Sequence, residues 1–185
     1  MNKKAIVILA DGFEEIEAVT PVDVLRRARV DVIIAGLSKK LVSSTRNLKI
    51  EADMELTEIT DADAIILPGG MPGAKNLANS KIVLKSIKNL NEKGRIVAAI
   101  CASPAFVLAP SGVLDGKKAT GYPGTEQEFG DKITVVDEPV VVDGNILTSR
   151  GPGTALAFAL KLVEILVGRE KAEELRENML AVYKG

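Results

Sequence analysis

Four short apolar runs divide the chain. They cover residues 5–10, 30–35, 63–67 and 96–100, so each is five or six residues long, with Asp31 inside the second and Asp63 at the start of the third. Apolar runs of this length are typical of strands that are covered on both faces, as in a parallel sheet. The pattern therefore predicts four central strands.

Apolar residues at helical spacing lie between and beyond these runs. Residues 14–27 show this spacing, and Pro21 within them predicts a kink or a split. Further helices are expected over 74–91 with a break and N-cap at 79–80, from 104 onward, over 155–167 and over 170–182.

Shorter strands are expected in the remaining segments. Residues 39–51 alternate weakly, which predicts short edge strands or a hairpin. Two more strands are expected over 116–120 and 133–136. Residues 140–148 predict another hairpin, because Asp143 and Gly144 form a strong two-residue turn signal.

Strands and helices thus alternate, which predicts an α/β sandwich with a mainly parallel sheet, in one domain over residues 1–185. Ligands of such sheets bind beyond the carboxyl ends of the strands. Four segments follow predicted strands and should therefore converge on one rim: 11–17, 68–73, 101 and 149–153.

Composition excludes several classes of protein. The 185 residues carry a net charge of -1, which gives no signal for nucleic-acid binding. No apolar stretch is long enough to cross a membrane, and the short apolar run near the start lacks the cleavage site of a signal peptide. A single cysteine rules out an intrachain disulfide, so we expect a cytoplasmic protein.

Histidine is absent from the sequence. A Cys-His or Ser-His catalytic pair within one chain is therefore excluded, as is a histidine-based metal site. No metal and no cofactor are expected. Any general acid or base must be a glutamate, aspartate, lysine, tyrosine or the cysteine itself.

Cys101 stands where the strand over 96–100 gives way to the helix that starts at 104. A lone cysteine is usually a small buried hydrophobe. At a strand-to-helix turn, however, it faces the amides that open the next helix, and these favour a thiolate. The context predicts a reactive cysteine.

Four carboxylates follow the first strand, at Asp11, Glu14, Glu15 and Glu17. Acids in the first turn of a helix favour its dipole, which is reason enough for some of them. A glutamate that faced the cysteine would share one proton with it, leaving the carboxyl neutral and the sulfur ionised. Spacing does not choose the residue, although Glu17 lies one helical turn from Glu14.

Four further positions could belong to a site or simply to turns and surface. Gly69 and Gly70 suit a tight turn, but they also let backbone amides approach a reacting carbonyl. Arg150 could be a surface charge or an anion clamp, and Tyr122 a packing residue or a hydroxyl that lines the site. Residues 151–154 are most simply a helix start, with Thr154 near the cap.

Together these segments resemble the DJ-1/ThiJ/PfpI superfamily, in the branch of the parkinsonism-associated protein and its bacterial ThiJ-like relatives. The likeness spans nearly the whole chain in order. The motifs that carry it lie at residues 5–17, 21–28, 67–70, 98–102 and 147–154.

The resemblance implies a flavodoxin-like three-layer sandwich with a cysteine at a nucleophile elbow, and usually a homodimer. In its terms Cys101 is the oxidisable nucleophile and Glu17 the protonated glutamate beside it, while Gly70 and Ala102 supply the amides of an oxyanion pocket. A small anion pocket near the subunit interface is implied as well, with residues Arg27, Arg46, Glu14 and Glu15.

Two departures from the family pattern bear on the chemistry. Tyr122 stands where the parkinsonism-associated protein has a histidine, and Ala102 where protease-like members have one. A peptidase mechanism therefore loses its base. A glyoxalase scheme that uses that histidine for proton transfer is also put in doubt, which leaves Glu17 to move protons alone.

The leading hypothesis is a cysteine-dependent stress-response enzyme that acts on reactive carbonyls. In family terms it would convert methylglyoxal to lactate or remove early glycation adducts from proteins, so its partners would be a small carbonyl or a glycated protein. The alternative is a redox sensor or chaperone that signals by oxidation of Cys101. A role in thiamine thiazole biosynthesis and peptidase activity rank below both.

Overall fold

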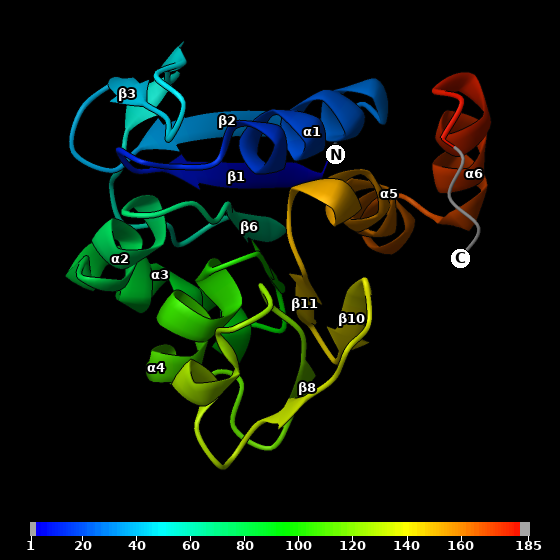
Figure 1. The fold of residues 1–185 in the computed structure, drawn as a ribbon. Coiled ribbons are helices and arrows are strands. Elements are labelled where there is room, and N and C mark those ends of the chain that lie inside the picture. Colours follow the sequence, from blue (N-terminus) through cyan, green and yellow to red (C-terminus); the bar gives the residue numbers. More distant parts are fainter. Residues whose placement is uncertain (1–2, 182–185) are drawn as a thin grey trace.

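The computed structural model describes residues 3–181, and a seven-stranded sheet forms its centre (Figure 1). The strand order is β10-β11-β7-β6-β1-β2-β5. Every neighbouring pair is parallel except β10 with β11. The four predicted central strands are β1 (Lys4–Leu9), β2 (Asp31–Gly36), β6 (Ala64–Leu67) and β7 (Ile96–Ile100).

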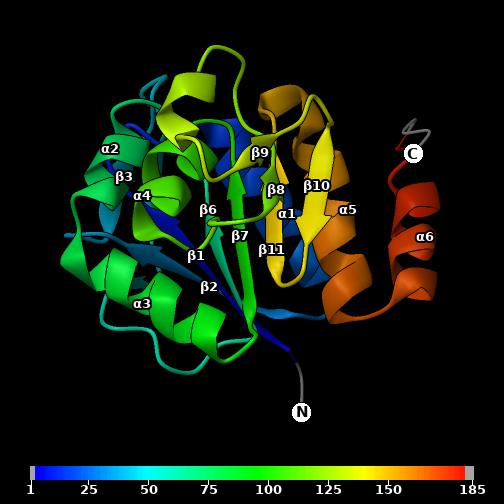
Figure 2. The ribbon, with the colours of Figure 1, turned by 90° about the horizontal axis from the view of Figure 1, so that it is seen from below.

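Helices cover both faces of the sheet, which gives the three layers expected (Figure 2). On one face α1 (Glu15–Arg27) packs against β1, β2 and α5 (Ala155–Leu166). On the other, α3 (Lys81–Glu92) packs against β6 and β7, and α2 (Gly73–Ala78) lies beside it. Because both faces are covered, β6 is buried along its whole length. The fold is thus flavodoxin-like.

Helix boundaries follow local capping chemistry. Ser80 caps α3 by accepting a hydrogen bond from the Val83 N–H, so the predicted break at 79–80 is confirmed. Glu14 caps α1 in the same way. Pro21 does not split α1, which runs unbroken through it. A proline in the second turn removes only one intrahelical hydrogen bond.

The small strands largely match the sequence pattern. The predicted hairpins are β3 (Leu41–Ser43) with β4 (Lys49–Glu51), and β10 (Val140–Asp143) with β11 (Ile146–Ser149). The strands β8 (Lys118–Ala119) and β9 (Thr134–Val135) form a separate parallel pair. The sequence pattern missed β5 (Met54–Glu55), because two residues at a sheet edge carry no periodic signal.

The helix after Cys101 has an unusual winding. Residues Pro104–Leu108 form a π-helical segment, and α4 (Ala109–Ser111) continues it. Here the Ala109 N–H donates to the Pro104 carbonyl, five residues earlier. Such π-segments are frequent at functional sites.

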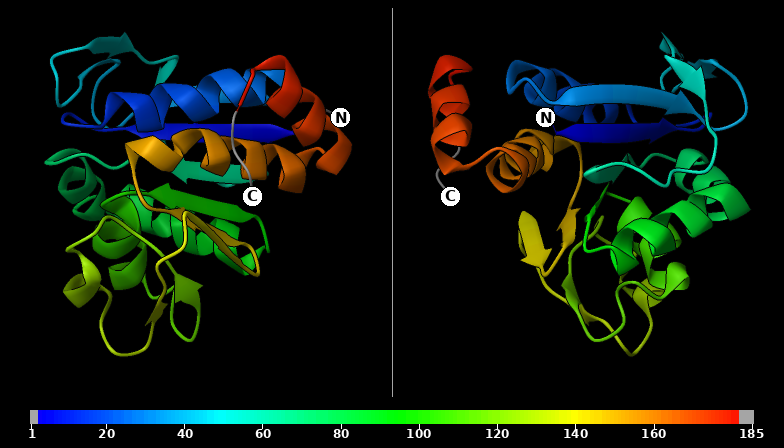
Figure 3. Two further views of the ribbon diagram at one scale, coloured as in Figure 1. Left: turned by 45° about the vertical axis from the view of Figure 1, so that its right-hand side comes forward. Right: turned by 180° about the vertical axis from the view of Figure 1, so that it is seen from behind.

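The C-terminal end of the described chain packs on the outside of the molecule. The helix α6 (Arg169–Asn178) contacts α5 and lies apart from the sheet (Figure 3). It is shorter than the helix expected over 170–182, and Val182 lies outside the described residues. No helix within residues 3–181 is long and apolar enough to cross a membrane.

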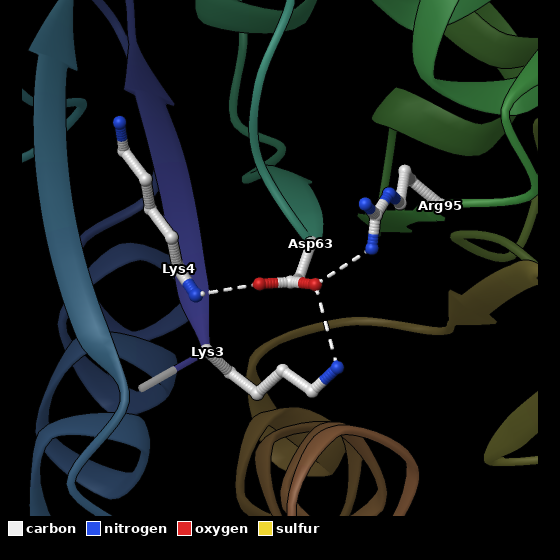
Figure 4. A network of polar contacts seen from close by, with 4 residues as sticks. All are labelled: Lys3, Lys4, Asp63 and Arg95. Atoms are coloured by element: carbon white, nitrogen blue, oxygen red, sulfur yellow. Dashed lines mark hydrogen bonds and ion pairs between the residues drawn. The ribbon is translucent and has the colours of Figure 1, made fainter. Parts of the chain in front are cut away.

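The amino ends of three central strands are joined by one carboxylate (Figure 4). Asp63 accepts hydrogen bonds from the Lys4 backbone N–H at 2.9 Å and from Arg95 Nη1 at 2.8 Å, and Lys3 Nζ lies 3.4 Å away. Burial raises the pKa of Asp63, but these donors and charges lower it by more, so the pKa of Asp63 is below its ordinary value. These contacts connect the amino ends of β1, β6 and β7. The candidate site lies at the opposite, carboxyl ends of the strands.

The carboxyl ends of β1, β6, β7 and β11 meet at one rim, as predicted, because these parallel strands stand close together in the sheet order. The four loops that follow them carry the carboxylates, the two glycines, Cys101 and Arg150.

Candidate active site

Cys101 occupies a sharp corner at the end of β7. Its φ is +65°, in the left-handed region that non-glycine residues seldom adopt. The surrounding structure holds it there: its N–H donates to the Ser149 carbonyl at 2.9 Å, and its carbonyl accepts from the Tyr122 N–H at 2.8 Å. The side chain is only 8% exposed. This strained strand-to-helix corner is the expected nucleophile elbow.

Glu17 is the buried acid of the site. It is 0% exposed although it belongs to the first turn of α1. Its Oε2 accepts a hydrogen bond from the Gly69 N–H at 2.8 Å. Its Oε1 is buried and has no hydrogen-bond partner within residues 3–181. A buried carboxyl oxygen left in this state is available to a reacting group or to a proton.

Gly69 shows how closely the sulfur and the carboxyl converge. A Cβ at this position would lie 2.7 Å from Cys101 Cβ, 2.8 Å from Glu17 Oε2 and 2.9 Å from the Ala102 nitrogen. Only glycine fits between these groups. The neighbouring Gly70 has a φ of +86° and is similarly crowded by Glu14 and Gly12 backbone atoms.

The cysteine and the glutamate affect each other's titration. Burial raises the pKa of Glu17 from 4.5 to about 7, even though hydrogen bonds from Cys101 and Gly69 lower it. Burial and the charge of an ionised Glu17 raise the pKa of the Cys101 thiol to about 12, while the N–H groups of Gly70 and Ala102 lower it. The two groups therefore cannot both be ionised near neutral pH, and the pair keeps one proton.

The raised pKa of the thiol bears on where that proton lies. Part of the rise comes from the negative charge of Glu17, and that part vanishes when the carboxyl keeps the proton. The sulfur then faces the N–H groups of Gly70 and Ala102, which favour a thiolate.

The three clustered glutamates have separate contacts, which spacing alone could not assign. Glu14 accepts from the Glu17 N–H at 2.9 Å and so caps α1. Glu15 points to the β3–β4 hairpin, where its carboxylate accepts from Ser44 Oγ at 2.5 Å. Only Glu17 faces the cysteine.

The residues proposed for an anion pocket are only partly brought together. The Arg46 backbone N–H donates to Glu15 Oε1 at 2.7 Å, so these two are neighbours. Arg27 lies at the other end of α1, about 20 Å from Glu14 along the helix, and pairs with Asp23 at 2.9 Å. Within one chain Arg27 is therefore remote from the others, and the anion pocket stays a prediction.

Tyr122 and Arg150 line a cavity of about 240 Å³ beside the cysteine backbone. Arg150 follows Ser149, which pairs with Ile100 across the sheet, so it stands next to the Cys101 corner. Its guanidinium pairs with Asp137. The Tyr122 ring lies close to Gly151, in the loop that borders Glu17. Both side chains thus lie near the site, although neither is shown to contact the sulfur.

Sequence reasoning missed two contributors to this geometry. The sequence suggests a turn or a backbone amide near a reacting carbonyl at Gly69, but not that Gly69 donates to Glu17 and leaves room for the sulfur. The signal was its place in a glycine pair directly after a buried strand. The hairpin residues Ser44 and Thr45, which bind Glu15, gave no signal, because their contact depends on the fold.

The fold and the site together define a flavodoxin-like α/β protein with a buried cysteine at a nucleophile elbow and a carboxyl beside it. Comparison with known proteins gives the family. The DJ-1/PfpI family matches residues 3–165, and the chain therefore belongs to that family, as its motifs predict.

Individual relatives agree with this assignment. Protein dj-1beta of Drosophila melanogaster is 42% identical over 187 residues, covering 99% of this chain and 100% of that protein. Its crystal structure has a TM-score of 0.94 to this fold at 41% identity, with 99% and 100% of the two chains covered.

Two further relatives carry informative names. The Parkinson disease protein 7 homolog of Danio rerio is 41% identical over 185 residues, covering 97% of each chain. A Caenorhabditis elegans protein named glutathione-independent glyoxalase DJR-1.2 is 35% identical over 177 residues, covering 94% of each.

Proposed function

We propose that this protein is a cofactor-independent enzyme that acts on small reactive carbonyls through Cys101 and Glu17. The observation that carries the proposal is the convergence of the two side chains around Gly69, with a carboxyl oxygen that is buried and unpartnered within residues 3–181. The glyoxalase named among the relatives supports the choice of substrate class. Methylglyoxal and early glycation adducts of proteins are the substrates proposed.

The reaction begins with attack of the Cys101 thiolate on the aldehyde carbon of methylglyoxal. A carbon–sulfur bond forms, and the oxyanion takes the proton of Glu17, which gives a hemithioacetal. The amides of Gly70 and Ala102, which face the sulfur, are placed to stabilise the negative oxygen.

Glu17 then moves a second proton. Its carboxylate removes the proton from the former aldehyde carbon to give an enediol and delivers it to the adjacent carbon, while the hydroxyl proton of the hemithioacetal passes to the neighbouring carbonyl oxygen. The product is a thioester of lactate. Water cleaves the thioester, releasing lactate and restoring the thiol. The balance is methylglyoxal plus water to lactate, with no external oxidant or reductant. On a glycation adduct the same attack would give a hemithioaminal.

The test is lactate formation from methylglyoxal by wild type, Cys101→Ser and Glu17→Gln. We expect both variants to lose activity by at least about a hundredfold, since one lacks the nucleophile and the other the proposed proton carrier. Glu51→Gln, an exposed glutamate on β4, serves as the matched control and should keep full activity. Equal rates in wild type and Cys101→Ser, or no lactate from any of them, would refute the proposal.

We also propose that the protein forms a homodimer through α1 and the β3–β4 hairpin. Ile16 and Val19 on α1 are 52% and 45% exposed, and Leu41 and Leu48 on the hairpin are 52% and 48% exposed. An apolar cavity of about 140 Å³ joins the two elements. Its lining comprises residues Leu9, Ala18, Val19, Val22, Ile34 and Ile50. Exposed apolar surface around such a cavity is typical of an interface.

A further inference from the structure

The segment that precedes α1 lies between two other parts of the molecule. Residues 11–15 contact the tip of the β3–β4 hairpin at residues 43–46 on one side and the loop at residues 69–73 on the other. The hairpin lies at the outer end of the molecule, beside the start of α1 (Figure 1). The loop at 69–73 carries the glycines of the active site.

On the hairpin side, Glu15 makes the densest set of contacts. Its Oε1 accepts from Ser44 Oγ at 2.5 Å and from the Arg46 N–H at 2.7 Å, and its Oε2 accepts from Thr45 Oγ1 at 3.0 Å. Burial raises the pKa of Glu15, but these donors lower it by more, so the pKa of Glu15 is below its ordinary value. The carboxylate is therefore ionised at neutral pH. Hydrogen bonds to a charged group are strong, so these three hold the hairpin tip to the start of α1.

Backbone contacts and a second carboxylate complete this side. The Gly12 N–H donates to the Ser43 carbonyl at 2.7 Å, and the Thr45 N–H donates to the Phe13 carbonyl at 2.8 Å. Asp11 accepts from the Ser43 N–H at 2.9 Å and pairs with Lys39. The hairpin tip and residues 11–15 therefore form one connected unit.

On the site side, the same segment sets the position of the two glycines. The Glu14 N–H donates to the Gly69 carbonyl at 3.0 Å, and the Gly73 N–H donates to the Gly12 carbonyl at 3.2 Å. A Cβ on Gly70 would lie 2.5 Å from the Glu14 nitrogen. Gly69 in turn donates to Glu17. A shift of residues 11–15 must therefore displace the Gly69 amide, Glu17 or both.

We propose that Glu15 is a positioning residue: its carboxylate binds the tip of the β3–β4 hairpin and thereby holds the first turn of α1, with Glu17, in register with Gly69 and Cys101. The consequence for catalysis rests on the proposed function. The positioning itself does not, because it concerns the geometry of Glu17 and Gly69. The role differs from that of an anion-pocket residue, since the Glu15 carboxylate is already bound by three donors of the hairpin.

The test compares four variants with wild type. Glu15→Ala removes all three hairpin bonds, and Ser44→Ala removes one of them from the other partner. Glu15→Gln is the conservative rescue, because its amide oxygen can accept from Ser44 and Arg46 while its NH₂ donates to Thr45. Glu51→Ala, on the same hairpin, is the control.

Two properties are measured for each variant. One is the hydrogen-exchange rate of the amides in residues 43–46 and of Gly69. The other is the pH profile of Cys101 alkylation by iodoacetamide, which requires no carbonyl substrate.

In Glu15→Ala we expect faster exchange at both places and a shifted profile, with alkylation slowed roughly threefold or more at neutral pH. Ser44→Ala should show the same changes to a smaller extent. Glu15→Gln and Glu51→Ala should match wild type. If exchange and alkylation in Glu15→Gln match wild type, the hydrogen bonds of residue 15 position the site and its negative charge is not needed.

The proposal is overturned if the hairpin amides of Glu15→Ala exchange faster while Gly69 exchange stays at the wild-type rate, or if neither changes. If Glu15→Ala does not fold, Ser44→Ala and Thr45→Val decide by the same criteria. Should wild-type Cys101 titrate as an ordinary thiol, the proposed function fails, and the positioning role is still judged on Gly69 exchange.

Discussion

At the scale of single residues, the proposed chemistry depends on one buried carboxyl. Glu14, Glu15 and Glu17 are identical side chains within four positions, yet one caps a helix, one binds a hairpin and one faces the cysteine. Only Glu17 loses its contact with water. Its burial is what raises its pKa to about 7, which suits the proposed role as a proton carrier.

The burial of Glu17 should make the free energy of unfolding depend on pH. The folded Cys101–Glu17 pair keeps both of its protons up to about pH 7, whereas the unfolded chain loses the Glu17 proton near 4.5. The contribution of Glu17 is therefore full below pH 4.5 and is lost as the pH rises through about 7. Glutamine at this position cannot ionise. We predict that Glu17→Gln gains on wild type by up to about 3 kcal/mol in unfolding free energy between pH 4.5 and 7.5.

Urea unfolding of both proteins across this pH range measures the difference. Carboxylates elsewhere titrate in both proteins, so their effect cancels in the comparison. If the two stability profiles ran parallel, Glu17 would not be the buried acid described here.

At the scale of elements, the site lies where the carboxyl ends of three strands converge. β1, β6 and β7 each deliver one part of it: the glutamate helix, the glycine loop and the cysteine corner. The parts touch because the Gly69 backbone has no side chain to separate them.

We predict that Gly69→Ala disrupts the packing of Cys101 against Glu17. The added methyl group would overlap Cys101, Glu17 and the Ala102 nitrogen at 2.7–2.9 Å, and overpacking of this kind costs about 1–3 kcal/mol. Alkylation of Cys101 should slow as well. Gly153→Ala is the matched control, because a Cβ there meets no atom of the described residues within 4 Å. Thermal unfolding that is unchanged in Gly69→Ala would contradict the packing described here.

Much of this architecture could be predicted from the sequence, for a physical reason. Strands buried on both faces must be apolar throughout, so β1, β6 and β7 are visible as continuous runs. The loops after them then had to share a rim, and Cys101 at the end of one was a natural candidate. Family motifs added Glu17.

Other features could not be predicted, because they depend on tertiary contacts. The contact of Glu15 with Ser44 joins residues 29 positions apart and has no local signature. The π-helical winding after Cys101 and the two-residue strand β5 also lack a periodic signal.

At the scale of the whole molecule, the two ends of the sheet differ. At the amino ends Asp63 binds the Lys4 backbone N–H and the side chains of Lys3 and Arg95 (Figure 4). The carboxyl ends carry the strained cysteine and the buried acid. Beside this functional end lies the apolar surface formed by α1 and the β3–β4 hairpin.

That surface leads to a prediction about assembly. We expect wild type to sediment at twice the 19.6 kDa mass of the chain, and Val19→Glu to sediment as a monomer, because a charge would be buried in the interface. Ile82→Glu is the control, since Ile82 is 44% exposed on α3, on the other face of the sheet. A monomeric wild type, or a Val19→Glu protein that still dimerises, would count against the proposed interface.

The central claim is that Glu17 holds the shared proton and Cys101 is a thiolate at neutral pH. The direct measurement is the ultraviolet absorbance of the thiolate, followed against pH in wild type and Glu17→Gln, with Cys101→Ser as the blank. Wild type is predicted to show the thiolate at neutral pH, because the carboxyl then holds the one proton that the pair keeps. Glu17→Gln should change this little, because its side chain is neutral like the protonated carboxyl. If instead the thiolate of wild type appeared only near pH 12, and Glu17→Gln shifted it far downward, the proton would lie on the sulfur and the claim would be wrong.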